Sequence, residues 1–342
     1  MPQMFKLASS IAGLRVVALA LFALSAGACA SDTLEPSTTM GSDAVEGLAS
    51  DSLPADSLVV QTLGIDNPAF ALSAVALARQ GTPFGFWRLE YSQLSVNWTS
   101  LHRGASPAGI RRDLEIARKV GGRVFLQLAG RKQNYQNSNG SFSLTKFKAL
   151  LAQYKGLNLD SYIADGTLAG HMLIDEPSDK SNWNGKPMPY SDVEAAAKAS
   201  KAIWPKMPAL VRAVPTWLQG ANFRWVYLDG AWGQYSARKG DVTRYVAAET
   251  RAAGAEGLKM VWGLNVLDGG DGSSGRRGTV SGRYNMSATE LQKYGKVLLG
   301  ASNTCGFLMW MYSSTYMSRS TVMDAMKSLS RLAKTRPIQA CR

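Results

Sequence analysis

Two adjacent carboxylates, Asp175 and Glu176, follow an apolar run at 172–174 and precede Pro177. The run has the length and composition of a buried strand, and proline lacks the N–H that would continue a strand. The pair is therefore expected where a strand opens into a loop. One protonated carboxyl group and one carboxylate placed across a glycosidic bond can cleave it, so acid/base chemistry is one role for such residues. The alternative is structural, because Asp175 or Ser178 could cap a following helix.

Strand and helix signals alternate from residue 83 onward. Several of the strand-like runs are continuously apolar, as expected for a sheet that is covered on both faces. Expected strands are 84–91, 123–129, 170–176, 209–214, 225–229, 259–266 and 306–312, and expected helices are 107–120, 144–154, 191–204, 242–253, 288–299 and 321–334. This pattern predicts an α/β fold, a single (β/α)8 TIM-type barrel. The eighth strand is expected within 92–102 or near residue 70.

The second catalytic carboxylate is expected from another strand, because neighbouring residues on a strand point to opposite faces of the sheet. On that ground the two adjacent carboxylates are not expected to be the catalytic pair. Asp229, which follows the apolar run 225–228, is the first candidate and is predicted to face the same cavity as Glu176. Asp268 is the second candidate and Glu90 the third. The alternative is that Asp229 pairs with a neighbouring Arg or caps a loop, since structural ion pairs imitate functional sites.

Polar and aromatic side chains crowd the other expected strand ends. In a (β/α)8 barrel the loops after the strands build the site. Aromatic rings stack on the apolar faces of sugars, while amides and charged groups bind the hydroxyls. The expected substrate-binding residues are Asp175, Glu90, Arg88, Gln127, Trp232, Gln234, Tyr235, Asn265, Trp310 and Tyr312. For Trp232 and Trp310, packing in the core is the alternative.

The stretch Asp175-Glu176-Pro177 after an apolar strand resembles the Asn-Glu-Pro motif of the retaining (β/α)8-barrel glycoside hydrolases. Trp310, on the last expected strand, resembles the tryptophan that forms the sugar platform in that superfamily. In architecture the resemblance covers residues 80–335. It implies that Glu176 is the general acid/base, on the fourth strand if one early strand is still hidden.

The same resemblance places a nucleophile at the end of the seventh strand, where this chain carries Asn265 and Asp268 instead of Glu. Asp175 likewise replaces the Asn of the motif. The implied function is that of an exported glycoside hydrolase acting on a poly- or oligosaccharide by two-carboxylate acid/base chemistry. Because the seventh-strand Glu is missing, the alternative is a catalytically inert barrel lipoprotein that binds carbohydrate or cell-wall polymer.

Residues 1–28 have the pattern of an export signal peptide. Lys6 and Arg15 precede an apolar run at 16–24 that is too short to span a membrane, and small residues follow it. Cys29 comes next and resembles the lipidated cysteine of bacterial lipoproteins. The expected location is therefore the exterior of a membrane, with the chain anchored through Cys29. Secretion or release into the periplasm after ordinary signal-peptidase cleavage is the alternative.

Three segments are expected: the signal peptide 1–28, a tether 29–80 and the barrel domain 81–342. Ser, Thr, Asp, Gly and Pro dominate the first half of the tether, as in solvated linkers, and its second half ends in a short apolar segment.

The formal charge of +13 is unevenly distributed. The signal contributes Lys6 and Arg15, and residues 30–78 carry seven acids and no Lys or Arg, which leaves +18 on residues 79–342. A domain with this much positive charge favours anionic partners. The alternative is that the charge serves only to keep the domain soluble. The expected partner is a carbohydrate, neutral or anionic. Nucleic acid is not expected, because no basic stretch is interleaved with aromatic residues.

The chain has three cysteines and two histidines. Setting Cys29 aside leaves Cys305 and Cys341, which are predicted to form a disulfide in an oxidising compartment. Both are expected on the barrel face opposite the site. With two distant histidines and no thiolate cluster, neither a metal site nor a cofactor is expected. A monomer is expected, touching the membrane only through the N-terminal lipid.

Overall fold

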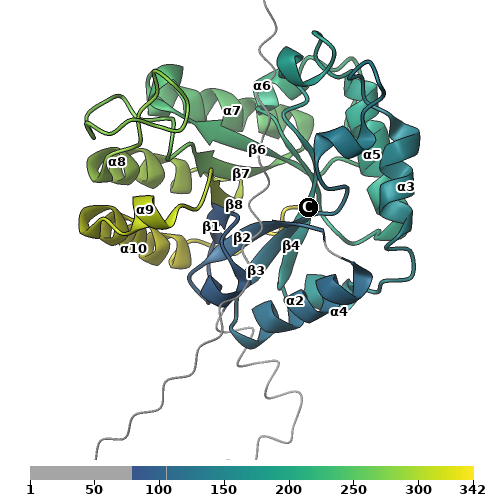
Figure 1. Ribbon diagram of the computed structural model, residues 1–342, viewed down its shortest axis with the longest axis horizontal. Helices are drawn as coiled ribbons and strands as arrows, with labels where there is room; N and C mark the ends of the chain where they lie inside the picture. The colour runs from purple at the N-terminus through teal and green to yellow at the C-terminus, as the bar shows by residue number, and fades with distance from the viewer. Residues whose placement is uncertain (1–78, 105) are drawn as a thin grey trace, which may run out of the picture. The chain divides into compact units, whose positions relative to one another are not determined.

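The computed structural model describes residues 79–104 and 106–342. In this part of the chain eight parallel strands close into one barrel, each pairing with the next in sequence and β8 with β1 (Figure 1). The strands are β1 (Phe84–Trp87), β2 (Thr99–Arg103), β3 (Arg123–Gln127), β4 (Leu168–Asp175), β5 (Ala209–Arg212), β6 (Gly230–Tyr235), β7 (Lys259–Leu264) and β8 (Thr304–Met309). The predicted (β/α)8 TIM-type barrel is confirmed.

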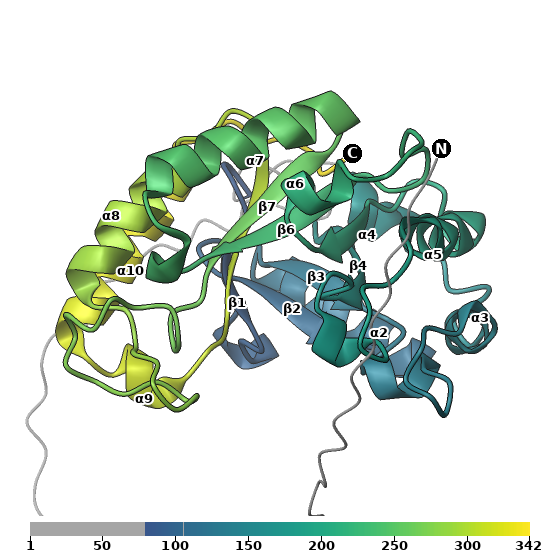
Figure 2. The same cartoon turned by 90° about the horizontal axis from the view of Figure 1, so that it is seen from above.

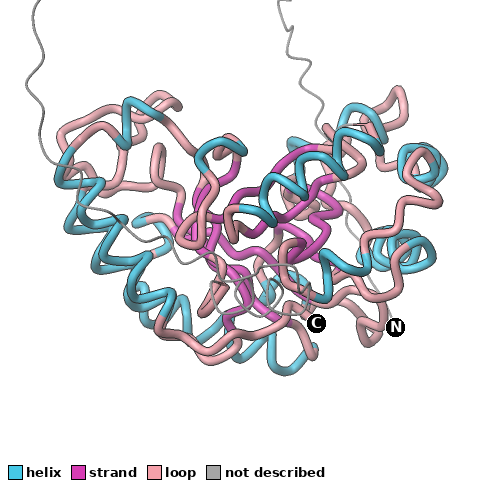
Figure 3. Tube along the Cα trace, turned by 90° about the horizontal axis from the view of Figure 1, so that it is seen from below, coloured by secondary structure: helices cyan, strands magenta, loops and turns pink. Residues whose placement is uncertain are grey.

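Helices form an outer layer around the strands (Figures 2 and 3). They are α2 (Pro107–Lys119), α3 (Leu144–Ala152), α4 (Asp160–Ala164), α5 (Tyr190–Ile203), α6 (Pro215–Leu218), α7 (Val242–Glu256), α8 (Ala288–Leu299), α9 (Ser314–Met317) and α10 (Ser320–Lys334). Their starts follow local sequence signals. The Ser106 side chain accepts a hydrogen bond from the backbone N–H of Gly109, and Ser287 with Glu290 forms a capping box. No helix within residues 79–104 and 106–342 is long and apolar enough to cross a membrane.

The strand that the sequence left unplaced is β2. It overlaps the 92–102 stretch, so the first of the two expected positions is confirmed. Its side chains at 99–101 are buried, and Leu101 points into the barrel interior. With β2 in place, β4 is the fourth strand and β7 the seventh, as the resemblance implied.

The strand predicted at 225–229 is wrong, because β6 begins at Gly230. The backbone N–H groups of residues 226, 227 and 228 donate instead to the carboxylate of Glu194 on α5, at 2.7, 2.9 and 3.2 Å. These groups are therefore satisfied by a helix side chain rather than by a neighbouring strand. Asp229 consequently lies at the beginning of a strand, not at its end.

The barrel interior is filled by side chains that alternate with outward-facing ones along each strand. Every strand contributes to a buried cluster, formed by Trp87, Leu101, Phe125, Met172, Leu210, Trp232, Val261, Cys305 and Leu308 from the strands and by Cys341 from the C-terminal tail. A larger cluster joins the outer strand faces to the helices. A core packed in this way leaves ligand binding to the loops at the strand ends.

The predicted disulfide between Cys305 and Cys341 is present, with Cα atoms 5.0 Å apart. Cys305 is the second residue of β8, so the bridge ties the C-terminal tail to the face of the barrel where the strands begin. Cys29, the signal peptide and the tether up to residue 78 lie outside the described residues.

Replacing Cys341 with Ser should lower the free energy of unfolding by about 2–4 kcal/mol, because the bridge closes a 36-residue loop in the unfolded chain. Urea unfolding of the wild type and the variant, each with and without a reductant, measures the difference. Reductant should affect only the wild type. Equal unfolding midpoints for the wild type and the variant in the absence of reductant would contradict the stabilising role of the disulfide.

Candidate active site

Asp175 and Glu176 converge at the carboxyl end of β4. Asp175 is the last residue of the strand, and Glu176 adopts a left-handed backbone with φ of 50°. That conformation is uncommon for a residue with a Cβ atom. Arg212 contacts both carboxylates, with Nη1 2.8 Å from Asp175 Oδ1 and Nη2 3.0 Å from Glu176 Oε1. The expectation that the two side chains point to opposite faces is therefore wrong, because Glu176 lies beyond the regular strand.

Arg212, the last residue of β5, holds this arrangement in place. Its side chain is only 11% exposed. Besides the two carboxylates it donates to Gln234 Oε1 at 2.7 Å, and its guanidinium carbon lies 4.8 Å from the ring centre of Trp310 and 5.2 Å from that of Trp232. A planar guanidinium with partners on its edge and aromatic rings against its faces has little freedom to move.

Both carboxylates remain accessible to a ligand. The side chains of Asp175 and Glu176 are 34% and 41% exposed. Asn182 donates to Glu176 Oε2 at 3.4 Å, and Trp183 Nε1 donates to the Glu176 main-chain carbonyl at 2.9 Å. The backbone of Glu176 is thus fixed independently of its carboxylate.

Two cavities flank the pair. The first, of about 370 Å³, contains Asp175 and lies at the ends of β1 to β4; the second, of about 260 Å³, contains Glu176 and lies beyond β4 to β7. The first is lined by Arg88, Arg103, Gln127, Arg131, Lys132, Gln133 and Asp175. The second is lined by Glu176, Ser178, Arg212, Ala213, Val214, Trp232, Gln234, Tyr235, Ser236, Arg238, Lys239 and Asn265. Asp175 and Glu176 are the carboxylates among these described lining residues.

Trp87 and Trp310 stack on each other in the barrel mouth, with ring centres 4.1 Å apart and planes 13° from parallel. Trp310 is partly buried, and it also contacts Arg212. Trp232 is 2% exposed and donates from Nε1 to the Leu308 carbonyl at 3.1 Å. For Trp232 the packing alternative therefore holds, and this ring is part of the lining of the second cavity.

Asp229 lies at the opposite end of the barrel from Glu176. Its Oδ2 accepts a hydrogen bond from the Ala209 N–H at 2.7 Å and pairs with Lys201 Nζ at 2.5 Å. Ala209 is the first residue of β5, which places both groups where strands begin. The prediction that Asp229 faces the cavity of Glu176 is wrong, and the structural ion pair is the correct reading.

Asp268 and Glu90 lie on the correct side of the barrel but line neither cavity. Asp268 is buried in the loop after β7, where it accepts hydrogen bonds from Thr279 Oγ1 at 2.5 Å and from Val280 N–H at 2.9 Å. Glu90 is exposed and caps the 3-10 turn η1 (Tyr91–Gln93). Neither residue supplies the second carboxylate in this geometry.

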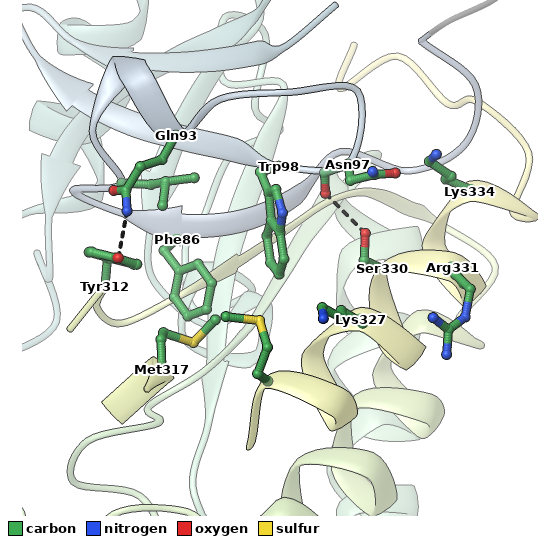
Figure 4. Close-up of a pocket in the computed structure, with 12 residues that line it drawn as sticks. Phe86, Gln93, Asn97, Trp98, Tyr312, Met317, Lys327, Ser330, Arg331 and Lys334 are labelled. Atoms are coloured by element: carbon green, nitrogen blue, oxygen red, sulfur yellow. Dashed lines mark hydrogen bonds between the residues drawn. The ribbon is translucent and has the colours of Figure 1, made fainter. Parts of the chain in front are cut away.

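Tyr312 belongs to a different cavity, of about 430 Å³, between the 89–98 loop and α10 (Figure 4). Gln93 Nε2 lies 2.5 Å from the Tyr312 hydroxyl, and Trp98 and Phe86 line the same space. Three cations from α10, Lys327, Arg331 and Lys334, also line it, and its described lining includes no carboxylate. Tyr312 is therefore misplaced by the prediction that put it in the barrel mouth.

The remaining predicted residues lie at the mouth. Gln127 and Arg88 line the first cavity, and Gln234, Tyr235 and Asn265 line the second. Tyr235 donates its hydroxyl proton to the Gly240 carbonyl, and Asn265 Oδ1 accepts from the Asp268 N–H at 3.0 Å. These two side chains already have protein partners, so their contribution is to shape the cavity wall.

Sequence reasoning missed Arg212 and Arg103. Arg212 was detectable as the charged residue in the otherwise apolar run 209–214, where a charge marks the end of a buried strand. Arg103 had no such signal, because β2 itself was not recognised and its last residue could not be placed at the mouth.

Both histidines are packing residues. His171, on β4, is fully buried, and its Nδ1 hydrogen-bonds Ser200 Oγ on α5 at 2.8 Å. Burial lowers the pKa of His171 to about 3. His102 stacks on Tyr91 with ring centres 3.9 Å apart, and burial lowers its pKa to about 4. Within the described chain no group of three or more potential metal-ligating side chains occurs.

The buried histidines predict a loss of stability in mild acid. Because the folded-state pKa of His171 lies below its unfolded value of about 6.5, the unfolded chain binds the extra proton as pH falls. Lowering the pH from 7 to 5 should therefore cost about 2 kcal/mol of unfolding free energy from His171 alone. Urea unfolding at both pH values measures the loss. The chemical shifts of the imidazole carbons of His171 in NMR spectra should stay constant between pH 7 and pH 5. A shift that changes with pH in this range would contradict the lowered pKa of His171.

No protein-family model matches the chain, and no curated protein matches it in sequence. Similar solved structures include an endoglucanase catalytic domain from Xanthomonas campestris pv. campestris, at 11% identity over 75% of this chain and 94% of that one, with a TM-score of 0.43. A β-glucanase from Saccharophagus degradans matches at 10% identity over 75% and 89%, with a TM-score of 0.47. An endocellulase from Pyrococcus horikoshii matches at 10% identity over 74% and 92%, with a TM-score of 0.46. At these values the likeness is one of barrel architecture alone.

Proposed function

We propose that this chain is a glycoside hydrolase that cleaves a poly- or oligosaccharide at the mouth of the barrel, with Glu176 as general acid/base. The observation that carries the proposal is the convergence of Asp175 and Glu176 on Arg212, with one cavity on either side. A saccharide lying across the two cavities would bring a glycosidic bond next to both carboxylates.

The roles follow from the contacts of each group. Glu176 is the more exposed carboxylate, and among the described residues its Oε2 has only the long contact with Asn182. This oxygen is therefore available to exchange a proton with the leaving group. Asp175 then supplies the second carboxylate, which either attacks the anomeric carbon or activates a water molecule. This assignment replaces Asp229 and Asp268, which line neither cavity.

A second candidate function is a catalytically inert barrel that binds carbohydrate. Two observations favour it: Arg212 bridges both carboxylates, and the residue after β7 at the mouth is Asn265. The polar and aromatic mouth would then serve recognition without bond cleavage.

A panel of glycans, scored for new reducing ends and for retention on the protein, separates the two functions. Cleavage by the wild type supports the hydrolase. Binding without cleavage supports the inert barrel. If no glycan is bound or cleaved, both proposals fail.

We further propose that the chain is exported and anchored through a lipid on Cys29, on the strength of the signal pattern in residues 1–28. Labelling with a radioactive fatty acid in a bacterial host should mark the wild type but not the Cys29→Ser variant. Equal labelling of both would contradict lipidation at this residue.

A further inference from the structure

The cavity that contains Asp175 is strongly cationic. Arg88, Arg103, Arg131 and Lys132 line it, and Asp175 is the one acidic residue in its described lining. The Asp175 carboxylate already forms a salt bridge with Arg212 of β5. The space therefore carries a large excess of positive charge that the residues described by the structure do not neutralise.

Two of the cavity arginines, Arg88 and Arg103, pack against the same aromatic ring. The guanidinium carbons of Arg88 and Arg103 lie 4.6 and 5.0 Å from the ring centre of Trp87. Trp87 is 5% exposed and is held by the stacked ring of Trp310. In the part of the chain that the structure describes, no carboxylate lies within salt-bridge distance of Arg88, Arg103 or Arg131.

Crowding of these cations has an electrostatic cost. Burial lowers the pKa of Arg103, and the nearby charges of Arg88 and Arg131 lower it further, while Asp175 acts in the opposite direction. A bound anion would offset this repulsion, because an opposite charge at short range favours the charged guanidinium.

We propose that this cavity binds an anionic substituent, a carboxylate or a sulfate, carried by a sugar of the substrate. The inference rests on the proposed function and specifies its substrate class as an acidic oligo- or polysaccharide. Arginine forks donate paired hydrogen bonds to such oxyanions, and a volume of about 370 Å³ falls within the range of small-molecule sites.

The positive charge continues on the other side of the two carboxylates. Arg238 and Lys239 line the cavity that contains Glu176. A polymer with an anionic group on successive sugars would therefore meet cations on both sides of the cleaved bond. This feature favours an acidic polysaccharide over a neutral chain with a single charged end.

Binding to short charged sugars and to their neutral counterparts tests the proposal. The ligands are trigalacturonate with its methyl ester, and cellotriose 6-sulfate with cellotriose. Calorimetry at physiological salt, in the Glu176→Gln background so that no ligand is consumed, should show at least about tenfold tighter binding of a charged ligand than of its counterpart. Whichever charged ligand binds identifies the substituent. Equal affinity within both pairs would overturn the inference.

Two matched variants separate a local site from the net charge of the domain. Arg131→Gln removes an exposed cation from the cavity, and Arg251→Gln removes an exposed cation from α7. Arg131→Gln should weaken binding of the charged ligand about tenfold, while Arg251→Gln should leave it within about twofold. Equal losses in the two variants would overturn the inference.

Cleavage measurements keep this inference distinct from the proposed function. Hydrolysis of neutral glycans without preference for charged ligands would leave the hydrolase standing and remove the anion site. Selective binding of charged ligands without any hydrolysis would leave the anion site standing and remove the catalytic role of Glu176.

Discussion

Replacing Glu176 with Gln should lower kcat for any cleaved glycan by about 10²–10⁴-fold, the usual contribution of a general acid/base. Gln keeps the size of the side chain and an oxygen that can accept from Arg212, but it cannot exchange a proton with the leaving group. The backbone of residue 176 is held by Trp183 through its carbonyl oxygen, so the fold should be unchanged. The release of reducing ends measures the effect, and circular dichroism checks the fold.

Glu256→Gln is the matched control, because Glu256 is the last residue of α7 and lies outside both mouth cavities. It makes the same chemical change at a carboxylate that lines neither mouth cavity, and full activity is expected. Wild-type activity in the Glu176→Gln protein would exclude Glu176 as the general acid/base. Glu176 would then be assigned a role in substrate recognition only.

Replacing Asp175 with Asn should also reduce kcat by about 10²–10⁴-fold, because two-carboxylate cleavage needs a second ionised group across the bond. The Asn side-chain oxygen can still accept from Arg212 Nη1, so Glu176 should keep its position. Steady-state kinetics on the same substrate measures the loss. Asp324→Asn, at an exposed position on α10, provides the control with the same chemical change.

The anomer released by the wild type defines the role of Asp175. Retention of configuration would mean that Asp175 attacks the anomeric carbon, and inversion would mean that it activates water. Proton NMR of the first product distinguishes them. An unchanged kcat in the Asp175→Asn variant would contradict a catalytic role for Asp175. Glu176 would then be the only one of the two adjacent carboxylates with a proposed catalytic role.

Arg212 explains how adjacent carboxylates can share one site. Two carboxylates that contact the same guanidinium repel each other, and the guanidinium compensates that repulsion. The same guanidinium limits the space between the carboxylates, so a bound sugar has to approach from the exposed side of the pair. This is consistent with exposed fractions of 34% and 41% for the two side chains.

Much of the barrel could be predicted from the sequence, because its signals are local. Apolar runs of strand length alternate with helical patterns, and each can be recognised without knowledge of its neighbours. The carboxylates before Pro177 were placed correctly at the end of β4 for the same reason. The pair Cys305 and Cys341 followed from a simple count once Cys29 was set aside.

The position of β6 could not be predicted in this way. Residues 225–228 have the composition of a strand, but Glu194 on α5 binds three of their N–H groups. Which partner satisfies a backbone N–H depends on contacts between segments more than 30 residues apart, and periodicity does not reveal them. Because the sixth strand was predicted several residues too early, Asp229 was expected at the end of a strand, whereas it lies just before the beginning of β6. The predicted catalytic pair of Glu176 and Asp229 was wrong for the same reason.

The sequence by itself determined the barrel, the strand that ends at Asp175 and the cysteines that form the bridge, because each depends on residue type and local spacing. Only the tertiary structure decided which charges meet. Asp175 and Glu176 share a face because residue 176 has a φ of 50°, and they share Arg212 because β4 and β5 pair in a particular register. Arg88 and Arg103 converge on Trp87 because β1 and β2 are neighbours in the closed barrel. Closure and register are properties of the whole sheet, so the chemistry at its mouth follows from them and not from any single stretch of residues.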